Sequence, residues 1–316
     1  MSITTDSVNS LYPMQLVDEQ IKLVCRIIDR ELISKSEICN ELVDHYKSKR
    51  GKMIRPRLLL LAAGACGEIK KEHLLSAAIF EMIHNATLLH DDVIDCGMLR
   101  RNIPTVNSLW GNKAAILLGD IFLSHALKAS SNLEQQIITI ISDTMLETCE
   151  GEVMQDFNPN EKSISEDEYI QIIKMKSAAM FGSCCYLGAV LNHSEVNVCE
   201  RLKRYGILTG MAYQISDDIA DIYSNDNQLG KSSWRDIETQ ITTLPIIHLL
   251  SQGYEYVKLK TMSRSDIIEL LSERESISYC HGYIRQYCLQ AMDELACLPE
   301  SEYKTALKTL TKSISL

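Results

Sequence analysis

Apolar residues recur at three- and four-residue spacing along almost the whole chain. One such segment begins at Leu58–Ala63, and a second runs from Ala77 to Leu89. This spacing places the apolar side chains on one face of an α-helix. Further segments with the same pattern cover residues 114–127, 137–153, 170–191, 202–223, 265–273, 283–296 and 303–310. The pattern predicts an all-α fold, a large bundle of about ten or more helices.

Residues typical of turns gather near 100–112, 158–165 and 224–234, where we expect loops. The chain has only 14 glycines and 6 prolines in 316 residues, which favours long helices over many short strands. The sequence contains neither a low-complexity linker nor a tandem repeat. We therefore expect one domain over residues 1–316.

Charge and cysteine content narrow the class of protein. The net charge of −10 does not indicate a nucleic-acid-binding protein. The longest apolar run is far shorter than the ~18 residues of a transmembrane segment, so we expect none, and the N-terminal residues do not resemble a secretory signal. The 11 cysteines include no Cys-x-x-Cys pair, so we expect reduced thiols and a cytoplasmic protein.

Two stretches of the form Asp-Asp-x-x-Asp are the first pattern that indicates chemistry. Their acidic residues are Asp91, Asp92, Asp95, Asp217, Asp218 and Asp221. The first and last aspartates of each stretch share a helix face. A single stretch would be interpreted as a solvated acidic face, but both follow largely apolar segments, where unpaired carboxylates are costly. Mg²⁺ ions shared between the two stretches would remove this cost, since Mg²⁺ binds carboxylates together with phosphate oxygens.

Basic residues near these stretches supply what a diphosphate needs besides a metal. They are Lys52, Arg55, Arg100, Arg101, Lys176 and Lys231. Arginine offers a planar fork to phosphate oxygens, and lysine offers a compact charge. We expect one diphosphate on Mg²⁺ between the acidic stretches and a second, without metal, at Lys52, Arg55 and Arg101.

Six segments, in this order and spacing, resemble the trans-prenyltransferases, which are the all-trans polyprenyl diphosphate synthases. The segments are GKMIRP, EMIHNATLLHDDVIDCGMLRRNIPT, GEVMQ, KSAAMF, YQISDDIADIY and LGKSSWRDIETQITTLP. The resemblance covers about residues 45–250. It implies the isoprenoid synthase (class I terpenoid synthase) fold, Mg²⁺ as cofactor, a homodimer, and isopentenyl diphosphate and an allylic diphosphate as substrates.

The reaction that the resemblance implies lengthens an isoprenoid chain. The allylic diphosphate ionises to a carbocation, the double bond of isopentenyl diphosphate attacks it, and proton loss gives the longer product. Mg²⁺, Arg and Lys neutralise charge on the leaving diphosphate, which then accepts the proton. The walls near the cation must be apolar and dry, because water would quench it.

The resemblance also implies a role for each matching residue. The implied Mg²⁺ ligands are Asp91, Asp92, Asp95, Asp217 and Asp218, with Asp221 completing the second motif. The implied contacts of the allylic diphosphate are Arg100, Lys176 and Lys231, with Ser177 and Gln214 beside them. The implied site of isopentenyl diphosphate consists of Lys52, Arg55, His84 and Arg101, although a histidine on an apolar helix is commonly a core residue.

Three residues before the first acidic stretch bear on product length. Ala86, five residues before Asp91, lies about 7.5 Å down the helix, and it and Thr87 are small where early-stopping relatives often carry an aromatic residue. This favours a medium- or long-chain product. Phe80 lies about 16.5 Å down, nearly on the face of Asp91, and is either a floor for the chain or part of the core.

Several departures from the family pattern keep alternatives open. Asn102 replaces a usual glycine, Trp234 interrupts the Gly-Lys segment, and Gln240-Ile241 replace a Gly-Lys pair. The alternatives are a short-chain (farnesyl or geranylgeranyl) synthase, a non-catalytic subunit of a heteromeric synthase, and a terpene cyclase, which usually lacks the GKxxRP element. A di-iron bundle needs two Glu-x-x-His motifs, and only Glu81–His84 fits.

Overall fold

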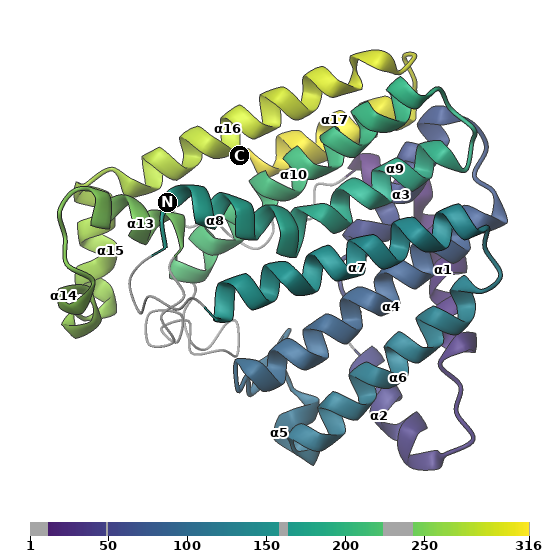
Figure 1. The fold of residues 1–316 in the computed structure, drawn as a ribbon, viewed down its shortest axis with the longest axis horizontal. Coiled ribbons are helices and arrows are strands. Elements are labelled where there is room, and N and C mark those ends of the chain that lie inside the picture. The colour runs from purple at the N-terminus through teal and green to yellow at the C-terminus, as the bar shows by residue number, and fades with distance from the viewer. Residues whose placement is uncertain (1–11, 49, 158–163, 224–242, 316) are drawn as a thin grey trace.

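The computed structural model describes residues 12–48, 50–157, 164–223 and 243–315. Its α-helices are α1 (Asp18–Glu31), α2 (Glu37–Lys47), α3 (Ile54–Cys66), α4 (Lys71–Ile94), α5 (Val106–Trp110), α6 (Asn112–Ser130), α7 (Gln135–Asp156), α8 (Glu166–Ile173), α9 (Ala179–Val190), α10 (Val196–Tyr223), α13 (Leu244–Ser251), α14 (Tyr256–Thr261), α15 (Arg264–Glu273), α16 (Ser276–Glu294) and α17 (Glu302–Ile314). The shorter elements are η2 (Tyr12–Val17), β1 (Leu99–Arg100), β2 (Ile103–Pro104), η3 (Lys174–Ala178) and η4 (Leu295–Cys297). The predicted all-α fold is confirmed (Figure 1).

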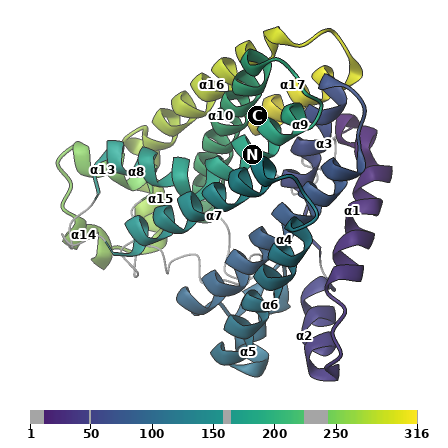
Figure 2. The same cartoon turned by 45° about the vertical axis from the view of Figure 1, so that its right-hand side comes forward.

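Four helices form the centre of the bundle. α9 packs against α3 on one side and α10 on the other, and α4 packs against α3 and α6. Every residue of α3 from Leu58 to Ala63 is fully buried, which explains why this segment reads as a continuous apolar run. The turned view in Figure 2 shows the C-terminal helices α16 and α17 lying along the α10 side of the bundle. The core therefore holds α4 and α10, the two helices that carry the acidic stretches.

Close approach of the central helices depends on small residues. A Cβ atom at Gly188 of α9 would lie 2.7 Å from the carbonyl oxygen of Leu59 in α3. A Cβ atom at Gly206 of α10 would lie 2.4 Å from the carbonyl oxygen of Phe181 in α9. No side chain fits at these distances, so the two glycines let α9 lie against both neighbouring backbones.

The prediction of one regular helix over residues 170–191 is wrong. The segment begins earlier, with α8, and a five-residue π-helical turn, η3 or Lys174–Ala178, separates α8 from α9. A π turn inserts one residue into an otherwise α-helical segment, so the apolar pattern on both sides still looks helical. We refer to Lys174–Ala178 as the π turn.

The predicted loop over residues 100–112 contains regular structure. β1 and β2 pair antiparallel as a short hairpin, and the five-residue helix α5 follows. The hydroxyl of Thr105 accepts a hydrogen bond from the backbone N–H of Ser108 and so caps α5. Elements this short leave too few residues for a periodic pattern.

The sequence prediction also omitted helices near both ends. In α1 the residues Ile21, Val24 and Ile28 are buried at helical spacing, which is a signal that pattern analysis can detect. α13 was also omitted; it forms a small separate core with α15, a helix that was predicted over residues 265–273, around Leu249 and Leu271. None of the helices in the described part of the chain has the length and apolar character that crossing a membrane requires.

Candidate active site

Both acidic stretches lie at the C-terminal ends of long helices. The first acidic cluster consists of Asp91, Asp92 and Asp95, and the second of Asp217, Asp218 and Asp221. α4 ends at Ile94, with Asp95 as its cap, and α10 ends at Tyr223. Both ends point toward the same side of the bundle, the left side of Figure 1. The carbonyl groups at a helix C-terminus carry partial negative charge, so each cluster strengthens a site that attracts cations.

Asp92 of the first acidic cluster is held by an arginine. Its side-chain oxygens accept hydrogen bonds of 2.8 and 3.0 Å from Nε of Arg100, and the residue is only 1% exposed. The amide of Asn107 donates to the Asp92 carbonyl, which fixes the backbone at the same point. Burial would lower the pKa of Arg100, but the Asp92 carboxylate outweighs it and raises the pKa. A charged hydrogen-bonded pair therefore ties the hairpin to the end of α4.

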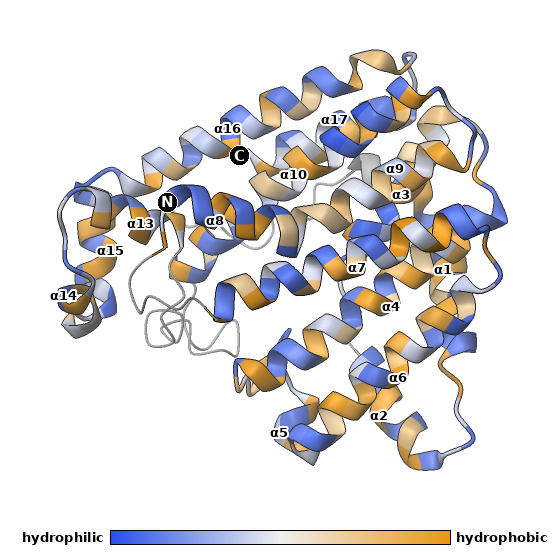
Figure 3. Cartoon of the chain, in the orientation of Figure 1, coloured by the Kyte–Doolittle hydropathy of each residue, from blue (hydrophilic) through white to orange (hydrophobic). Residues whose placement is uncertain are grey.

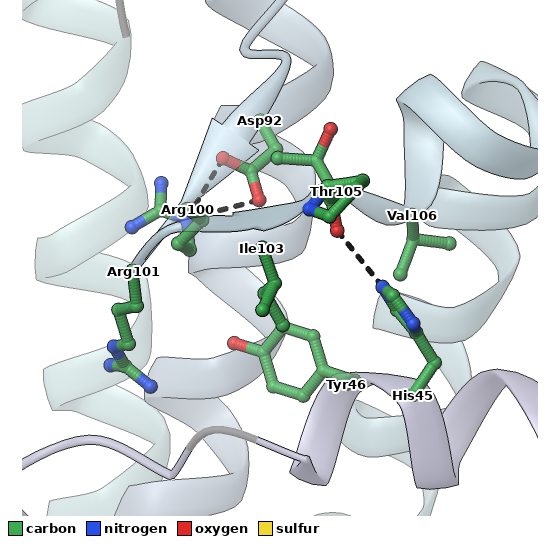
Figure 4. Close-up of a pocket in the computed structure, with 9 residues that line it drawn as sticks. His45, Tyr46, Asp92, Arg100, Arg101, Ile103, Thr105 and Val106 are labelled. Carbon is green, nitrogen blue, oxygen red and sulfur yellow. Dashed lines mark hydrogen bonds and ion pairs between the residues drawn. The ribbon is translucent and has the colours of Figure 1, made fainter. Parts of the chain in front are cut away.

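The turn between β1 and β2 directs the two neighbouring arginines differently. Arg101 and Asn102, its two central residues, have φ angles of 52° and 61°, as in a type I′ turn. Asparagine adopts this left-handed conformation more readily than most residues, so Asn102 is compatible with the turn where the family usually has glycine. Figure 4 shows Arg100 turned toward Asp92 and Arg101 extending away from it. The neighbouring hollow of about 320 Å³ is open to solvent and is also lined by His45 and Tyr46.

Lys176 of the π turn faces the first acidic cluster. Its Nζ donates to Oε1 of Glu152 at 2.7 Å and to Oε1 of Gln155 at 3.3 Å, both on α7. Burial would lower the pKa of Lys176, but Glu152 and Asp91 outweigh it and raise the pKa. Burial and the Glu152 carboxylate also raise the pKa of Asp91 to about 7. A Cβ atom at Gly151 would lie 2.5 Å from the backbone nitrogen of Lys176. This glycine therefore permits the close contact of α7 with the π turn.

The next residue of the π turn, Ser177, belongs to a chain of hydrogen bonds that leads to the second acidic cluster. Ser177 Oγ donates to Gln214 Oε1 at 2.6 Å, and Gln214 Nε2 donates to Asp218 Oδ1 at 2.8 Å. The other oxygen, Asp218 Oδ2, accepts a 2.6 Å hydrogen bond from Tyr169 Oη. Burial and Asp218 raise the pKa of Tyr169 well above its ordinary value, so the phenol remains a donor. Tyr169 was missed because a single tyrosine in a helix forms no pattern.

The π turn therefore connects the two clusters. Lys176 lies near Asp91, whereas Ser177 is hydrogen-bonded toward Asp218. Consecutive residues of a helical turn point in different directions, so Lys176 and Ser177 can serve different sides. Two stretches that are far apart in sequence thus lie on either side of one five-residue segment.

The donor set fits Mg²⁺ bound together with a phosphate ligand. In the part of the chain that the structure describes, no three His, Cys, Asp or Glu side chains come close enough together to enclose an ion. Mg²⁺ does not need such an enclosure, because it commonly binds one or two carboxylates and completes its shell with water and substrate oxygens. The clusters offer carboxylate oxygens, the ligands that this hard cation prefers.

Three of the four residues expected to bind isopentenyl diphosphate lie close together. The Arg101 guanidinium lies against Gly51, where a Cβ atom would be 2.5 Å from Arg101 Nη2. Arg55 stacks on the Phe181 ring at 5.1 Å, and its buried Nε has no hydrogen-bond partner among the described residues. Burial, reinforced by Arg55 and Arg101, lowers the pKa of His84 well below its ordinary value, so the ring is neutral. The unsatisfied guanidinium nitrogen is suited to an anionic ligand.

Lys52, the fourth residue, is exposed on the segment before α3, next to Met53 at a φ of 55°. Glu81 of α4 was not predicted as part of this site, yet it is buried and lines a solvent-open hollow with Arg50 and Arg101. Burial raises the pKa of Glu81, and Arg55 and Arg101 oppose this shift. Glu81 therefore places one acid among the arginines of this region.

The remaining predicted residues lie either in α4 or outside the described residues. Ala86 and Phe80 are fully buried in α4, and Thr87 Oγ1 donates to the His84 carbonyl at 2.9 Å. Lys231, Trp234, Gln240 and Ile241 lie outside the described residues. The described part of the site thus comprises both acidic clusters, the π turn and the arginines of the hairpin and α3.

An all-α bundle with acidic clusters on two central helices is the isoprenoid synthase fold. The chain belongs to the polyprenyl synthetase family, which it matches over residues 36–274. It is 34% identical over 300 residues to the all-trans-nonaprenyl-diphosphate synthase (geranyl-diphosphate specific) of Rhodobacter capsulatus, covering 91% of each chain. It is 31% identical over 307 residues to the octaprenyl diphosphate synthase of Haemophilus influenzae, covering 94% of this chain and 93% of the other.

A solved structure agrees with this assignment. The polyprenyl synthase of Caulobacter crescentus CB15, complexed with calcium and isoprenyl diphosphate, is similar with a TM-score of 0.88 at 27% identity. The similarity covers 97% of this chain and 98% of that chain. The expected family and fold class are confirmed.

Proposed function

We propose that this chain is an all-trans polyprenyl diphosphate synthase that joins isopentenyl diphosphate to an allylic diphosphate with the help of Mg²⁺. The observation that carries the proposal is the π turn, from which Lys176 faces one acidic cluster and Ser177 is bonded toward the other. The names of the relatives support this activity, as does the complex of the Caulobacter enzyme with a divalent cation and isoprenyl diphosphate.

The residues that would hold Mg²⁺ are the carboxylates of both clusters. We assign direct ligation to Asp91, Asp95, Asp217 and Asp218, with Asp221 beside them. Asp92 is better suited to holding Arg100, because it is 1% exposed and the Arg100 guanidinium offsets its charge. When bound, Mg²⁺ neutralises the charge that develops on the leaving diphosphate.

Arg100 and Lys176 neutralise part of the same charge from the protein side. The C–O bond of the allylic diphosphate breaks heterolytically, so both bonding electrons stay on the diphosphate. Lys176 is already held by Glu152, so it needs little reorganisation to face the leaving group. Ser177 and Gln214 orient Asp218 and line the same side of the site. We expect Lys231 to contribute a further cation to this diphosphate.

Lys52, Arg55, His84 and Arg101 would bind the diphosphate of isopentenyl diphosphate without metal. Arg55 supplies a buried donor, and neutral His84 supplies another. The double bond then forms a C–C bond with the allylic cation. The neighbouring carbon loses a proton to the released diphosphate, so no protein base is required.

The small residues Ala86 and Thr87 below the first cluster support a medium- or long-chain product. Phe80, fully buried farther along α4, is either the end of the chain-binding space or part of the core. Product chromatography of wild type beside Phe80→Leu distinguishes these roles. A longer product ladder from the variant identifies Phe80 as the floor, and an unchanged ladder assigns it to packing.

Turnover by the purified chain tests the enzyme against the alternative of a non-catalytic subunit. Labelled isopentenyl diphosphate, farnesyl diphosphate and Mg²⁺ are incubated with the single chain, and extracted products are resolved by length. We expect elongated all-trans products. Absence of any elongated product from the well-folded chain alone would contradict the proposal.

We also propose a homodimer in the cytoplasm. On α6, Leu117 is 50% exposed and Leu127 is 71% exposed, and Figure 3 shows hydrophobic residues along this helix. Exposed apolar residues that gather on one surface mark interaction sites. All eleven cysteines are free thiols, which suits a reducing compartment. Sedimentation analysis should give the mass of two chains, and the monomer mass would contradict the dimer.

A further inference from the structure

Tyr169 places a buried hydroxyl on the second acidic cluster. The residue is 3% exposed, and its ring packs in an apolar cluster with Ile173, Ala178 and Ile215. Its Oη donates to Asp218 Oδ2 at 2.6 Å, a short distance typical of a hydroxyl bonded to an ionised carboxylate. The packed ring therefore points its hydroxyl at one oxygen of Asp218.

Asp218 is held from both sides. Tyr169 donates to Oδ2, and Gln214 donates to Oδ1 at 2.8 Å. Asp221 is a like-charged neighbour three residues farther along the same helix, and repulsion would turn the Asp218 carboxylate away from it. Two fixed donors oppose this rotation, and each carboxylate oxygen has a further acceptor position for another partner.

The element that carries Tyr169 is itself anchored. At the start of α8, Ser165 and Glu168 form a reciprocal capping box. Glu166 accepts hydrogen bonds from Tyr279, at 2.7 Å, and from Tyr283, both on α16. The donor to Asp218 is thus fixed to the same short segment that continues into the π turn.

We propose that Tyr169 is a positioning residue of the second acidic cluster: its hydroxyl fixes the Asp218 carboxylate in the orientation that binds a divalent cation together with a diphosphate. This inference rests on the proposed function, in which Asp218 is a metal ligand. Tyr169 lies outside the acidic motifs, and its hydroxyl donates to Asp218. It acts through Asp218, because a carboxylate that is already oriented loses less freedom when the cation binds.

The test measures binding of inorganic pyrophosphate by titration calorimetry, with the full chain, over a series of Mg²⁺ concentrations. Tyr169→Phe keeps the buried ring and removes only the hydroxyl. We expect the Mg²⁺ concentration needed for half-maximal pyrophosphate binding to rise about 10- to 100-fold, the usual effect of removing a partner that orients a metal ligand. The KM for isopentenyl diphosphate should stay unchanged, because its site lies at Arg55 and Arg101.

Tyr205→Phe is the matched control. Tyr205 is fully buried in α10, donates to the Leu307 carbonyl at 3.0 Å and accepts from Thr311 Oγ1 at 3.1 Å, so the variant also loses buried hydroxyl hydrogen bonds. We expect its Mg²⁺ requirement to equal that of the wild type. The inference is overturned if Tyr169→Phe leaves the Mg²⁺ requirement at the wild-type value. It is also overturned if Tyr169→Phe and Tyr205→Phe raise the Mg²⁺ requirement equally.

Asp218→Asn separates failure of this inference from failure of the proposed function. If Asp218→Asn raises the Mg²⁺ requirement and Tyr169→Phe does not, only the role of Tyr169 is refuted. If Asp218→Asn leaves the requirement unchanged, the assignment of Asp218 as a ligand is refuted, and the inference with it. In the Asp218→Asn background, Tyr169→Phe should add nothing, since the two changes act on one interaction.

Discussion

The two acidic clusters share a motif and a position at a helix end, yet their central aspartates have different partners. Both side-chain oxygens of Asp92 accept a hydrogen bond from the charged Arg100, and the residue is 1% exposed. Asp218 accepts hydrogen bonds from two neutral groups, the Tyr169 hydroxyl and the Gln214 amide. Among the described residues, a charged guanidinium thus holds the central aspartate of one motif, and two neutral donors help to hold that of the other.

This difference indicates a division of roles. The Arg100 guanidinium offsets the charge of Asp92 and fixes the hairpin, so losing Arg100 should destabilise the fold in addition to any effect on the leaving diphosphate. The Tyr169 hydroxyl and the Gln214 amide orient the Asp218 carboxylate and bring no positive charge of their own to it. We therefore expect substitutions around Asp92 to affect stability most, and those around Asp218 to affect metal-dependent activity most.

The largest expected effect is on catalysis by Asp218→Asn. The amide keeps the size of the side chain but removes the charge that binds a cation, so kcat should fall at least about 100-fold. Steady-state kinetics at saturating substrates measures the loss. Asp143→Asn, an exposed acid on α7, is the control and should retain wild-type kcat. Wild-type turnover by Asp218→Asn would remove the second cluster from the mechanism.

Arg100→Gln should have the next largest effect, on stability. It leaves Asp92 buried without its cation, which costs about 3 kcal/mol. Tyr169→Phe removes one hydrogen bond to Asp218 and should cost only about 1 kcal/mol. Urea denaturation measures the free energy of unfolding of both variants. Arg204→Gln, which breaks the more exposed pair with Glu294, should cost less than about 1 kcal/mol. Equal losses for Arg100→Gln and Tyr169→Phe would contradict the contrast between the clusters.

A smaller effect is expected from Ser177→Ala. The variant loses the hydrogen bond that holds Gln214, and the amide becomes freer to turn from Asp218. A loss of about 1 kcal/mol corresponds to a fall of about fivefold in kcat/KM for the allylic substrate. Ser183→Ala, at a buried serine bonded to Thr144 in the core, serves as the control. A change of equal size in both variants would show that Ser177 acts only through general packing.

The smallest expected effect is on the pH dependence of stability, and it comes from His84, which belongs to neither cluster. The pKa of His84 lies well below its ordinary value in the folded chain, first through burial and then through Arg55 and Arg101. Above about pH 6.5 the ring is neutral in both states, so it contributes no pH dependence there. Below this pH the unfolded chain binds a proton that the folded chain does not, so stability falls as pH falls.

His84→Gln should remove that part of the pH dependence. Urea midpoints measured on both sides of about pH 6.5 should differ less in the variant than in the wild type. An unchanged difference would mean that other groups cause the acid sensitivity.

The sequence predicted those parts of the site that lie on long helices. The acidic motifs of α4 and α10 follow regular apolar spacing, so their position near helix ends could be inferred. The partners of the central aspartates could not be inferred in the same way. Arg100 reaches Asp92 because of a two-residue turn, and Tyr169 reaches Asp218 because α8 packs against α10.

The π turn was missed for a related reason. One inserted residue does not change apolar composition, and residues 170–191 keep an apparently helical pattern on both sides of it. The π turn nevertheless carries both Lys176 and Ser177, which serve different clusters. Local irregularities thus control the site, whereas the periodic signal controls the fold.

The most direct test of the central claim is a crystal structure of the full chain with Mg²⁺ and a thio-substituted, unreactive allylic diphosphate. We predict a diphosphate that is bridged by Mg²⁺ to carboxylates of both the first and the second acidic cluster, with Lys176 within hydrogen-bonding distance of its oxygens. A diphosphate bound away from either cluster, or held without a cation between them, would contradict the account.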